Sequence, residues 1–300
     1  GSALLPAPAG PLTLEDEIEL NRTLLASGAP ISAMNTIRKH VSRIKGGRLA
    51  AAAHPARVLS LIVSDIPGDD PAQVASGPTV AGKGGREDAL AAIRRFGIEV
   101  GDKVLAHISS AGSAAPEPSD GIFANHEHHV IASAAVSLEA AQAEARRQGI
   151  EAIILSDAIE GESREAAKVH AAIAREIASR GRPFAKPVVL LSGGETTVTV
   201  RGDGKGGRNT EFLLSLAMDI DGVEGIHALS ADTDGIDGSE DNAGAFADAG
   251  SAGRMRDKGL DPAAFLNNND AWTAFDAIGD IFAPGPTGTN VNDLRAILIR

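Results

Sequence analysis

Residues 188–195 read VVLLSGGE, an apolar run that leads directly into two glycines and a carboxylate. An apolar run of this length, bounded by turn residues, is typical of a strand that other layers cover on both faces. Helical segments that extend through Arg147 and Ser179 separate it from similar runs upstream. This alternation predicts βαβ units and an α/β fold with a mostly parallel sheet. The strands predicted in this half of the chain are 130–132, 152–155, 188–191, 196–200 and 227–230, and a helix is predicted at 209–218.

The other half of the chain begins with a helical pattern. Thr13 and Asp16 have the spacing of a helix N-cap pair, and Leu14, Ile18 and Leu25 fall on one face of the helix that follows. A second helix is predicted from residue 32, and a third at 86–95. The apolar run at 58–63 predicts a strand that is covered on both faces.

A chain of 300 residues has reached the length at which one hydrophobic core divides into two. The proline-rich run at 114–120 interrupts the regular pattern, so we place the domain boundary just after it. The sequence therefore predicts two three-layer α/β domains, 1–124 and 125–300, with mostly parallel sheets.

Composition excludes several classes of function. The formal net charge of −12 opposes binding to nucleic acid, and no stretch approaches the roughly 20 apolar residues of a membrane helix. The chain has no cysteine, which excludes disulfides, thiolate catalysis and Cys-ligated zinc. These features favour a cytoplasmic protein with small-molecule ligands, and they leave a homodimer open.

A glycine-rich turn precedes the predicted helix at 209–218. Residues 202–207 read GDGKGG, which matches the dinucleotide pattern G-x-G-x-x-G but is not a Walker A loop. Exposed backbone N–H groups at a helix N-terminus, together with Arg208, favour a phosphate site. The competing interpretation is a plain turn with a solvated Arg208.

Two acidic segments and one threonine-rich segment also follow strand-like runs. Asp232, Asp234 and Asp237 surround one turn, and Asp65 and Asp69 surround another. Mg²⁺ takes one or two carboxylates together with phosphate oxygens and water, which such turns can supply. Plain Asp-Gly turns are the alternative.

The segment from 285 to 293 reads GPTGTNVND. Thr287, Asn290 and the free N–H groups of this turn suit an anion or a ribose, although a purely structural turn fits equally well. No nucleophile elbow with a Ser-His-Asp arrangement is present in the sequence, so acyl transfer is disfavoured.

These segments carry a resemblance to a known family. The chain resembles the class II glycerate 2-kinases at 35–40, 44–49, 64–70, 75–79, 192–200, 206–211, 233–238 and 285–293. The last three segments fall in what that family calls the MOFRL domain, here about 187–300. The resemblance implies that 1–124 is the remainder of a Rossmann-like, glycerate-binding domain whose first βαβ unit would precede Gly1. It also implies that the active site lies in an interdomain cleft.

The same resemblance implies transfer of the ATP γ-phosphoryl group to the 2-hydroxyl of D-glycerate, which gives 2-phosphoglycerate. Some relatives are labelled hydroxypyruvate reductase and are linked to tartrate breakdown, so an NAD(P)H-dependent reductase is the first alternative. A non-catalytic binder of phosphorylated metabolites is the second.

Site residues follow from the matching motifs. By these motifs Arg208, Asp234 and Asp65 are the expected catalytic residues, and both aspartates are expected to hold Mg²⁺. The expected contacts to ATP are Gly193, Gly194, Glu195, Gly207, Thr287 and Asn290. The expected contacts to the substrate are Ser2, Arg38 and Lys45.

Overall fold

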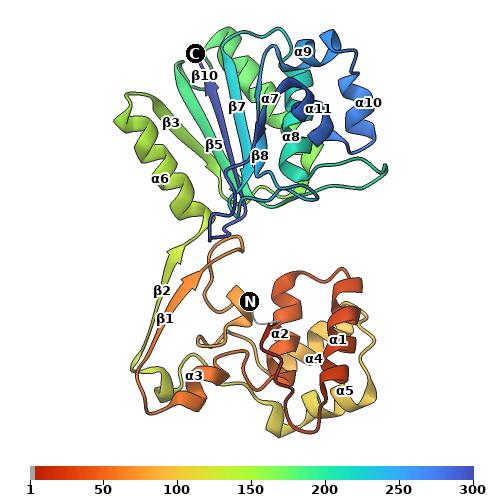
Figure 1. Ribbon diagram of the computed structural model, residues 1–300. Coiled ribbons are helices and arrows are strands. Elements are labelled where there is room, and N and C mark those ends of the chain that lie inside the picture. The colour runs from red at the N-terminus through yellow and green to blue at the C-terminus, as the bar shows by residue number, and fades with distance from the viewer. Residues whose placement is uncertain (1–3) are drawn as a thin grey trace. The chain divides into compact units, whose positions relative to one another are not determined.

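The computed structural model describes residues 4–300, in which the chain forms two compact units that divide between Ile131 and Ala132 (Figure 1). This division lies slightly beyond the boundary predicted at 124. The α/β class predicted from the sequence is confirmed, since each unit contains both helices and strands.

The first unit is mainly helical. Its helices are α1 (Leu14–Ala26), α2 (Ile31–Val41), α3 (Arg48–Ala53), α4 (Arg86–Arg95) and α5 (Asp102–Ser109), and its strands are β1 (Val58–Val63) and β2 (His126–Ala132). Helices α1, α2, α4 and α5 contribute most of one apolar core. The predicted three-layer arrangement is not found among residues 4–131, because β1 and β2 form a sheet of two strands only.

One local expectation in this unit is confirmed, the capped helix α1, and one is wrong, the covering of β1. Thr13 does cap α1, with Asp16 completing the capping box, but the buried face of the helix contains Leu20 and Leu24. The predicted apolar face of Leu14, Ile18 and Leu25 is exposed. Strand β1 is likewise not covered on both faces, since every second residue of it is exposed.

The second unit has three layers around a six-stranded sheet. The main strands are β3 (Glu151–Ser156), β5 (Val188–Gly194), β7 (Ile226–Asp232), β8 (Gly244–Asp248), β9 (Ile281–Phe282) and β10 (Asp293–Ile299), and a short pair joins β4 (Gly161–Glu162) to β6 (Thr196–Thr197). The helices are α6 (Ala134–Arg147), α7 (Ser163–Arg180), α8 (Arg208–Asp219), α9 (Ser251–Asp257), α10 (Pro262–Asn267) and α11 (Ala271–Ile278).

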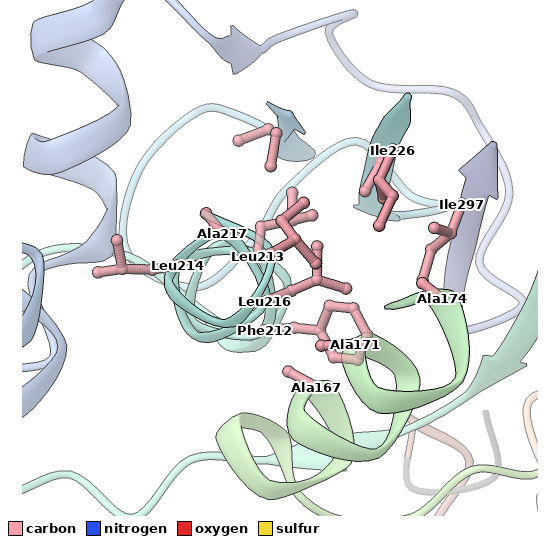
Figure 2. Packing of buried hydrophobic residues seen from close by; sticks show 14 of the residues in the cluster. Ala167, Ala171, Ala174, Phe212, Leu213, Leu214, Leu216, Ala217, Ile226 and Ile297 are labelled. Carbon is pink, nitrogen blue, oxygen red and sulfur yellow. The ribbon is translucent and has the colours of Figure 1, made fainter. Parts of the chain in front are cut away.

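Each face of this sheet has its own core. On one face Leu138 of α6 packs with Ala152 and Leu191. On the other face α7 and α8 form the larger core, in which Phe212 and its neighbours meet alanines of α7 and Ile297 of β10 (Figure 2).

The order of the strands is β3-β5-β10-β7-β8-β9. The sheet is mixed rather than mostly parallel, which corrects the prediction: β3 and β5 are parallel, and every other neighbouring pair is antiparallel. Two of these pairs arise because β10, the last strand of the chain, inserts between β5 and β7 in the opposite direction. The other two arise because β8 runs opposite to both of its neighbours, β7 and β9. The predicted strand at 196–200 is also shorter, because only Thr196–Thr197 pairs with another strand.

Among the helices of residues 4–300, none has the length and apolar character needed to cross a membrane.

Candidate active site

The insertion of β10 brings three strand ends together. Asp293, the first residue of β10, is paired with Gly194 at the end of β5 on one side and with Asp232 at the end of β7 on the other. Helix α8 begins with Arg208. The Arg208 side chain contacts Asp293 at the start of β10, Asp232 at the end of β7 and Glu195, which directly follows β5. Polar groups from distant parts of the sequence therefore meet at one edge of the sheet.

Arg208 is held by three carboxylates. Its Nε donates to Oδ1 of Asp293 at 2.7 Å, one terminal nitrogen donates to Asp232 at 2.6 Å and the other to Glu195 at 2.9 Å. Burial disfavours the charged guanidinium, but these carboxylates outweigh that effect and raise the pKa of Arg208. Three of the five N–H donors of the guanidinium are used in this way, and residues 4–300 leave the other two for a ligand.

The three partners differ in their exposure to solvent. The side chain of Asp293 is fully buried and that of Asp232 is 8% exposed, whereas that of Glu195 is 56% exposed. An exposed ion pair contributes little to stability, so Glu195 is the partner that an incoming anion can replace most easily.

The N-terminus of α8 contains an anion supplied by the protein. The carboxylate of Asp237 accepts hydrogen bonds from the backbone N–H of Asn209 at 2.9 Å and of Thr210 at 2.8 Å. A Cβ atom on Gly207 would lie 2.4 Å from this carboxylate, so the close approach requires glycine. The phosphate site predicted from these N–H groups is therefore corrected: Asp237 occupies them.

The loops after β7 and before β10 are joined by hydrogen bonds. Asp234 accepts from the backbone of Ile236 at 2.8 Å and from the side-chain amide of Asn290 at 3.1 Å. The N–H of Thr287 donates to the carbonyl of Asp234 at 3.2 Å. Three residues predicted for the site thus lie together, and Asp234 is linked to Arg208 because its N–H donates to Asp232.

Asp232 has a perturbed acidity. Burial raises the pKa of its carboxyl to about 6, and the neighbouring carboxylates of Asp234 and Asp293 act in the same direction, against Arg208 and the N–H of Asp234. A carboxyl that titrates near neutral pH inside a group of charges is typical of functional sites.

The predicted glycines at the end of β5 are buried and closely packed. Gly194 has a φ of +114°, and a Cβ atom on it would lie 2.2 Å from the backbone nitrogen of Ile159. Gly193 accepts a hydrogen bond from the same nitrogen at 3.0 Å. Packing against the Ile159 loop accounts for Gly194, and a Cβ atom on Gly193 would lie 3.2 Å from the carbonyl of Asp293. Glu195 is the part of the motif that reaches Arg208.

A cavity of about 490 Å³ opens beside Arg208. Its polar wall includes Glu195 and Asp232, and its apolar wall includes Val198, Val200 and Ala271. The backbone of Arg201 and Gly202, which follows the apolar wall, is held by the side chain of Asn269. The cavity therefore combines an arginine with a nearby apolar surface, both from the second unit.

The first unit contains a second cavity, of about 540 Å³, which is lined by the predicted substrate residues Arg38 and Lys45. Lys45 forms a buried ion pair of 3.1 Å with Glu17. Arg38 instead donates only to amide oxygens, those of Asn21 at 2.8 Å and Asn35 at 3.3 Å. Among residues 4–300 no carboxylate forms an ion pair with Arg38, and burial lowers its pKa. A half-buried cation without a counter-ion is suited to binding an anion.

Two predicted residues lie outside these clusters. Asp65 is exposed just after β1 in the first unit, whereas Asp234 belongs to the second unit. Ser2 lies outside the described residues. Within the part of the chain that the structure describes, no group of three or more His, Asp or Glu side chains is arranged to hold a metal ion.

Sequence reasoning missed Arg295 altogether. The signal was present, since Asp293, Arg295, Ile297 and Ile299 share the period of a strand face, and the last two are apolar. The structure buries all four residues on that face.

Two family models match separate parts of the chain. DUF4147, a domain of unknown function, matches residues 1–109, and the MOFRL family matches residues 188–293. A protein named D-glycerate 2-kinase, from Thermotoga maritima, is 40% identical over 299 residues, which cover 100% of this chain and 70% of that protein. A protein named putative hydroxypyruvate reductase, from Agrobacterium vitis, is 52% identical over 301 residues, which cover 100% of this chain and 68% of that protein.

A solved structure gives the same result. The crystal structure of glycerate kinase from Thermotoga maritima superposes with a TM-score of 0.89 at 40% identity, covering 98% of this chain and 69% of that one. The resemblance inferred from the motifs is thereby confirmed. The chain belongs to the glycerate kinase family of phosphotransferases.

Proposed function

We propose that the protein transfers the γ-phosphoryl group of ATP to the 2-hydroxyl of D-glycerate and releases 2-phosphoglycerate. The observation that carries this proposal is the fixed guanidinium of Arg208 beside a cavity, with two N–H donors left for phosphate oxygens. Phosphoryl transfer depends mainly on positioning and on stabilising the charge of the transferring group.

ATP would bind in the cavity of the second unit. Val198 and Val200 would contact the base, and the phosphates would approach Arg208 by replacing Glu195. Thr287 and Asn290 would contact phosphate or ribose from the adjoining loop. Gly207 would line the same cavity, whereas the buried Gly193 and Gly194, expected from the motifs, have no part in this proposal.

D-glycerate would bind in the cavity of the first unit. Its carboxylate would supply the counter-ion that Arg38 lacks among the described residues, and the bidentate geometry of arginine suits a carboxylate. Lys45 would contribute positive charge to the same cavity, and Ser2 would contact the substrate from the N-terminal segment.

Mg²⁺ would be held by the carboxylate of Asp234 together with phosphate oxygens of the nucleotide. One or two protein carboxylates are enough for this ion, so the donor set fits. Asp65, in the first unit, remains a metal ligand expected from the motifs alone. The ion would neutralise charge on the phosphates.

In the reaction, the O2 oxygen of glycerate forms a bond to the γ-phosphorus while the bond from that phosphorus to ADP breaks. The hydroxyl proton passes to a carboxylate, for which Asp234 and Asp65 are the candidates. Arg208 stabilises the charge on the transferring group.

We propose a cytoplasmic location, which the absence of cysteine supports.

The test uses the full-length protein with ATP, Mg²⁺ and D-glycerate, and identifies the product by ³¹P NMR. Arg208→Ala is expected to lower kcat on the order of 10³-fold, as for other arginines that contact a transferring phosphoryl group. Arg254→Ala is the matched control, because Arg254 on α9 pairs with Asp248 and Asp280. Near-normal turnover of Arg208→Ala would overturn the proposal.

Hydroxypyruvate reduction is the second candidate, favoured by the name of the relative from Agrobacterium vitis. The glycines at 202–207 give it little support. A Cβ atom on Gly202 would lie 2.3 Å from Asn268, and one on Gly204 would lie 2.3 Å from Asp270, so packing explains these glycines. Oxidation of NADH or NADPH with hydroxypyruvate, in the absence of phosphorylation of glycerate, would favour the reductase.

A further inference from the structure

Arg295 is a charged side chain in an apolar position of the sheet. It is 0% exposed, it shares one face of β10 with Ile297 and Ile299, and its guanidinium lies 5.0 Å from the ring centre of Phe212. Burial lowers its pKa. Burial of a cation costs several kcal/mol unless partners compensate, so its position calls for a specific role.

Arg295 donates to one carboxylate, to one hydroxyl and, at 3.5 Å, to the carbonyl of Gly193. One terminal nitrogen donates to Oδ2 of Asp293 at 2.5 Å and also to the hydroxyl of Thr196 at 3.0 Å. The other oxygen of Asp293, Oδ1, accepts from Nε of Arg208 at 2.7 Å and from the side chain of Asn209 at 2.8 Å. Each oxygen of Asp293 therefore binds a different arginine.

We infer that Arg295 is a positioning residue for Arg208 and acts through Asp293. This inference rests on the role of Arg208 in the proposed function, since it names the group that fixes that guanidinium. The bond to Oδ2 sets the rotation of the Asp293 carboxylate, and the rotation sets the direction in which Oδ1 faces Nε of Arg208. Without Arg295, Oδ2 keeps among the described residues only the bond from the N–H of Thr196 at 3.5 Å. The carboxylate then turns more easily, and the Arg208 guanidinium has a less firmly held anchor.

Charge supports the same role. Asp232, Asp293 and Glu195 surround Arg208, and Asp237 lies against the same turn of α8. This excess of negative charge opposes the approach of a phosphate group. Arg295 pairs with Asp293, and both side chains are fully buried. Its positive charge therefore offsets part of this negative charge, while its guanidinium does not compete with Arg208 for a ligand.

The experiment compares Arg295→Met with Arg254→Met, a control that breaks two ion pairs elsewhere in the same unit. The first readout is hydrogen exchange of the Nε–H of Arg208, followed by NMR of protein labelled in arginine and assigned by the loss of the signal in Arg208→Lys. The second readout is steady-state kinetics, and the third is the thermal midpoint.

We expect Arg295→Met to accelerate exchange of the Arg208 Nε–H by at least tenfold, and Arg254→Met to leave it unchanged. We expect kcat to fall on the order of 10²-fold, the effect of a small misplacement of a reacting group, while KM for glycerate stays within threefold. Arg295→Lys keeps the charge but not the fork, so it should restore only part of both losses.

Unchanged exchange at Arg208 in Arg295→Met, even with a lowered thermal midpoint, would overturn the inference and leave Arg295 a structural residue. If Arg295→Met does not fold, the same comparison is made with Arg295→Lys, and unchanged exchange there overturns it equally. The exchange readout needs no turnover. If the wild-type protein does not phosphorylate glycerate, the proposed function fails while the exchange result still decides the role of Arg295.

Discussion

Replacement of Asp237 by alanine tests whether this carboxylate fills the N-terminus of α8. Asp237 is 1% exposed and accepts from the N–H groups of Asn209 and Thr210 and from the hydroxyl of Thr210 at 2.9 Å. Loss of a helix N-cap costs about 1 kcal/mol, and a buried donor left without a partner costs about 1–3 kcal/mol more. We therefore expect Asp237→Ala to lower the free energy of unfolding of the second unit by about 2–4 kcal/mol.

The assay is urea denaturation followed by tryptophan fluorescence. Trp272 is the one tryptophan in the sequence and lies in α11, so its fluorescence reports on the second unit. Asp261→Ala is the control, because Asp261 caps α10 from an exposed position, and we expect a loss of about 1 kcal/mol or less. If Asp237→Ala is no more destabilising than Asp261→Ala, the carboxylate does not hold the helix and the reasoning is wrong.

Three further outcomes are expected. The folded-state pKa of Asp232, about 6, lies above its ordinary value of 3.8. The stabilisation that the Asp232 carboxyl contributes is therefore fully present below about pH 4 and is lost as the pH rises through about 6. The thermal midpoint of the wild type should fall between about pH 4 and 7 for this reason, and that of Asp232→Asn should lack the fall. Lys45→Met leaves Glu17 buried without a counter-ion and should lower the free energy of unfolding of the first unit by about 3–5 kcal/mol. The double variant Lys45→Met with Glu17→Leu should recover most of that loss. Hydrogen exchange of the backbone amides in α1 and α2 measures both effects. Gly194→Ala would place its Cβ 2.2 Å from the backbone of Ile159, and a urea midpoint equal to that of the wild type would contradict the close packing.

Local patterns predicted the elements of the second unit well and their arrangement poorly. The strand at 188–191, the strand at 227–230 and the helix at 209–218 all lie within the observed elements. Strand β10 was not predicted, because Asp293 and Arg295 interrupt its apolar pattern. Its insertion between β5 and β7 is a choice among distant partners, which no local pattern encodes, and it makes the sheet mixed.

The candidate site shows the same division. The loops that carry Arg208, Asp234 and Asn290 were expected to meet, and they do meet within the second unit. The partners of Arg208 could not be predicted, since the choice between a ligand phosphate and Asp293 depends on the register of β10. The roles of Asp234, Asn290 and Arg38 in catalysis and binding remain predictions.

The register of β10 explains how one arginine can be held rigidly at the edge of a sheet. Its three partners come from β7, β10 and the residue after β5, so rotation of the Arg208 guanidinium requires the bonds to three separate strands or strand ends to break. A cation fixed before the ligand arrives needs no reorganisation when charge develops on a phosphoryl group, and this preorganisation is a large part of electrostatic catalysis. The exposed residues Thr287 and Asn290 sit on a loop joined to Asp234, where adjustment to a ligand leaves the buried charges in place. The insertion of β10 between β5 and β7, which local patterns did not predict, is thus what gives Arg208 its fixed position.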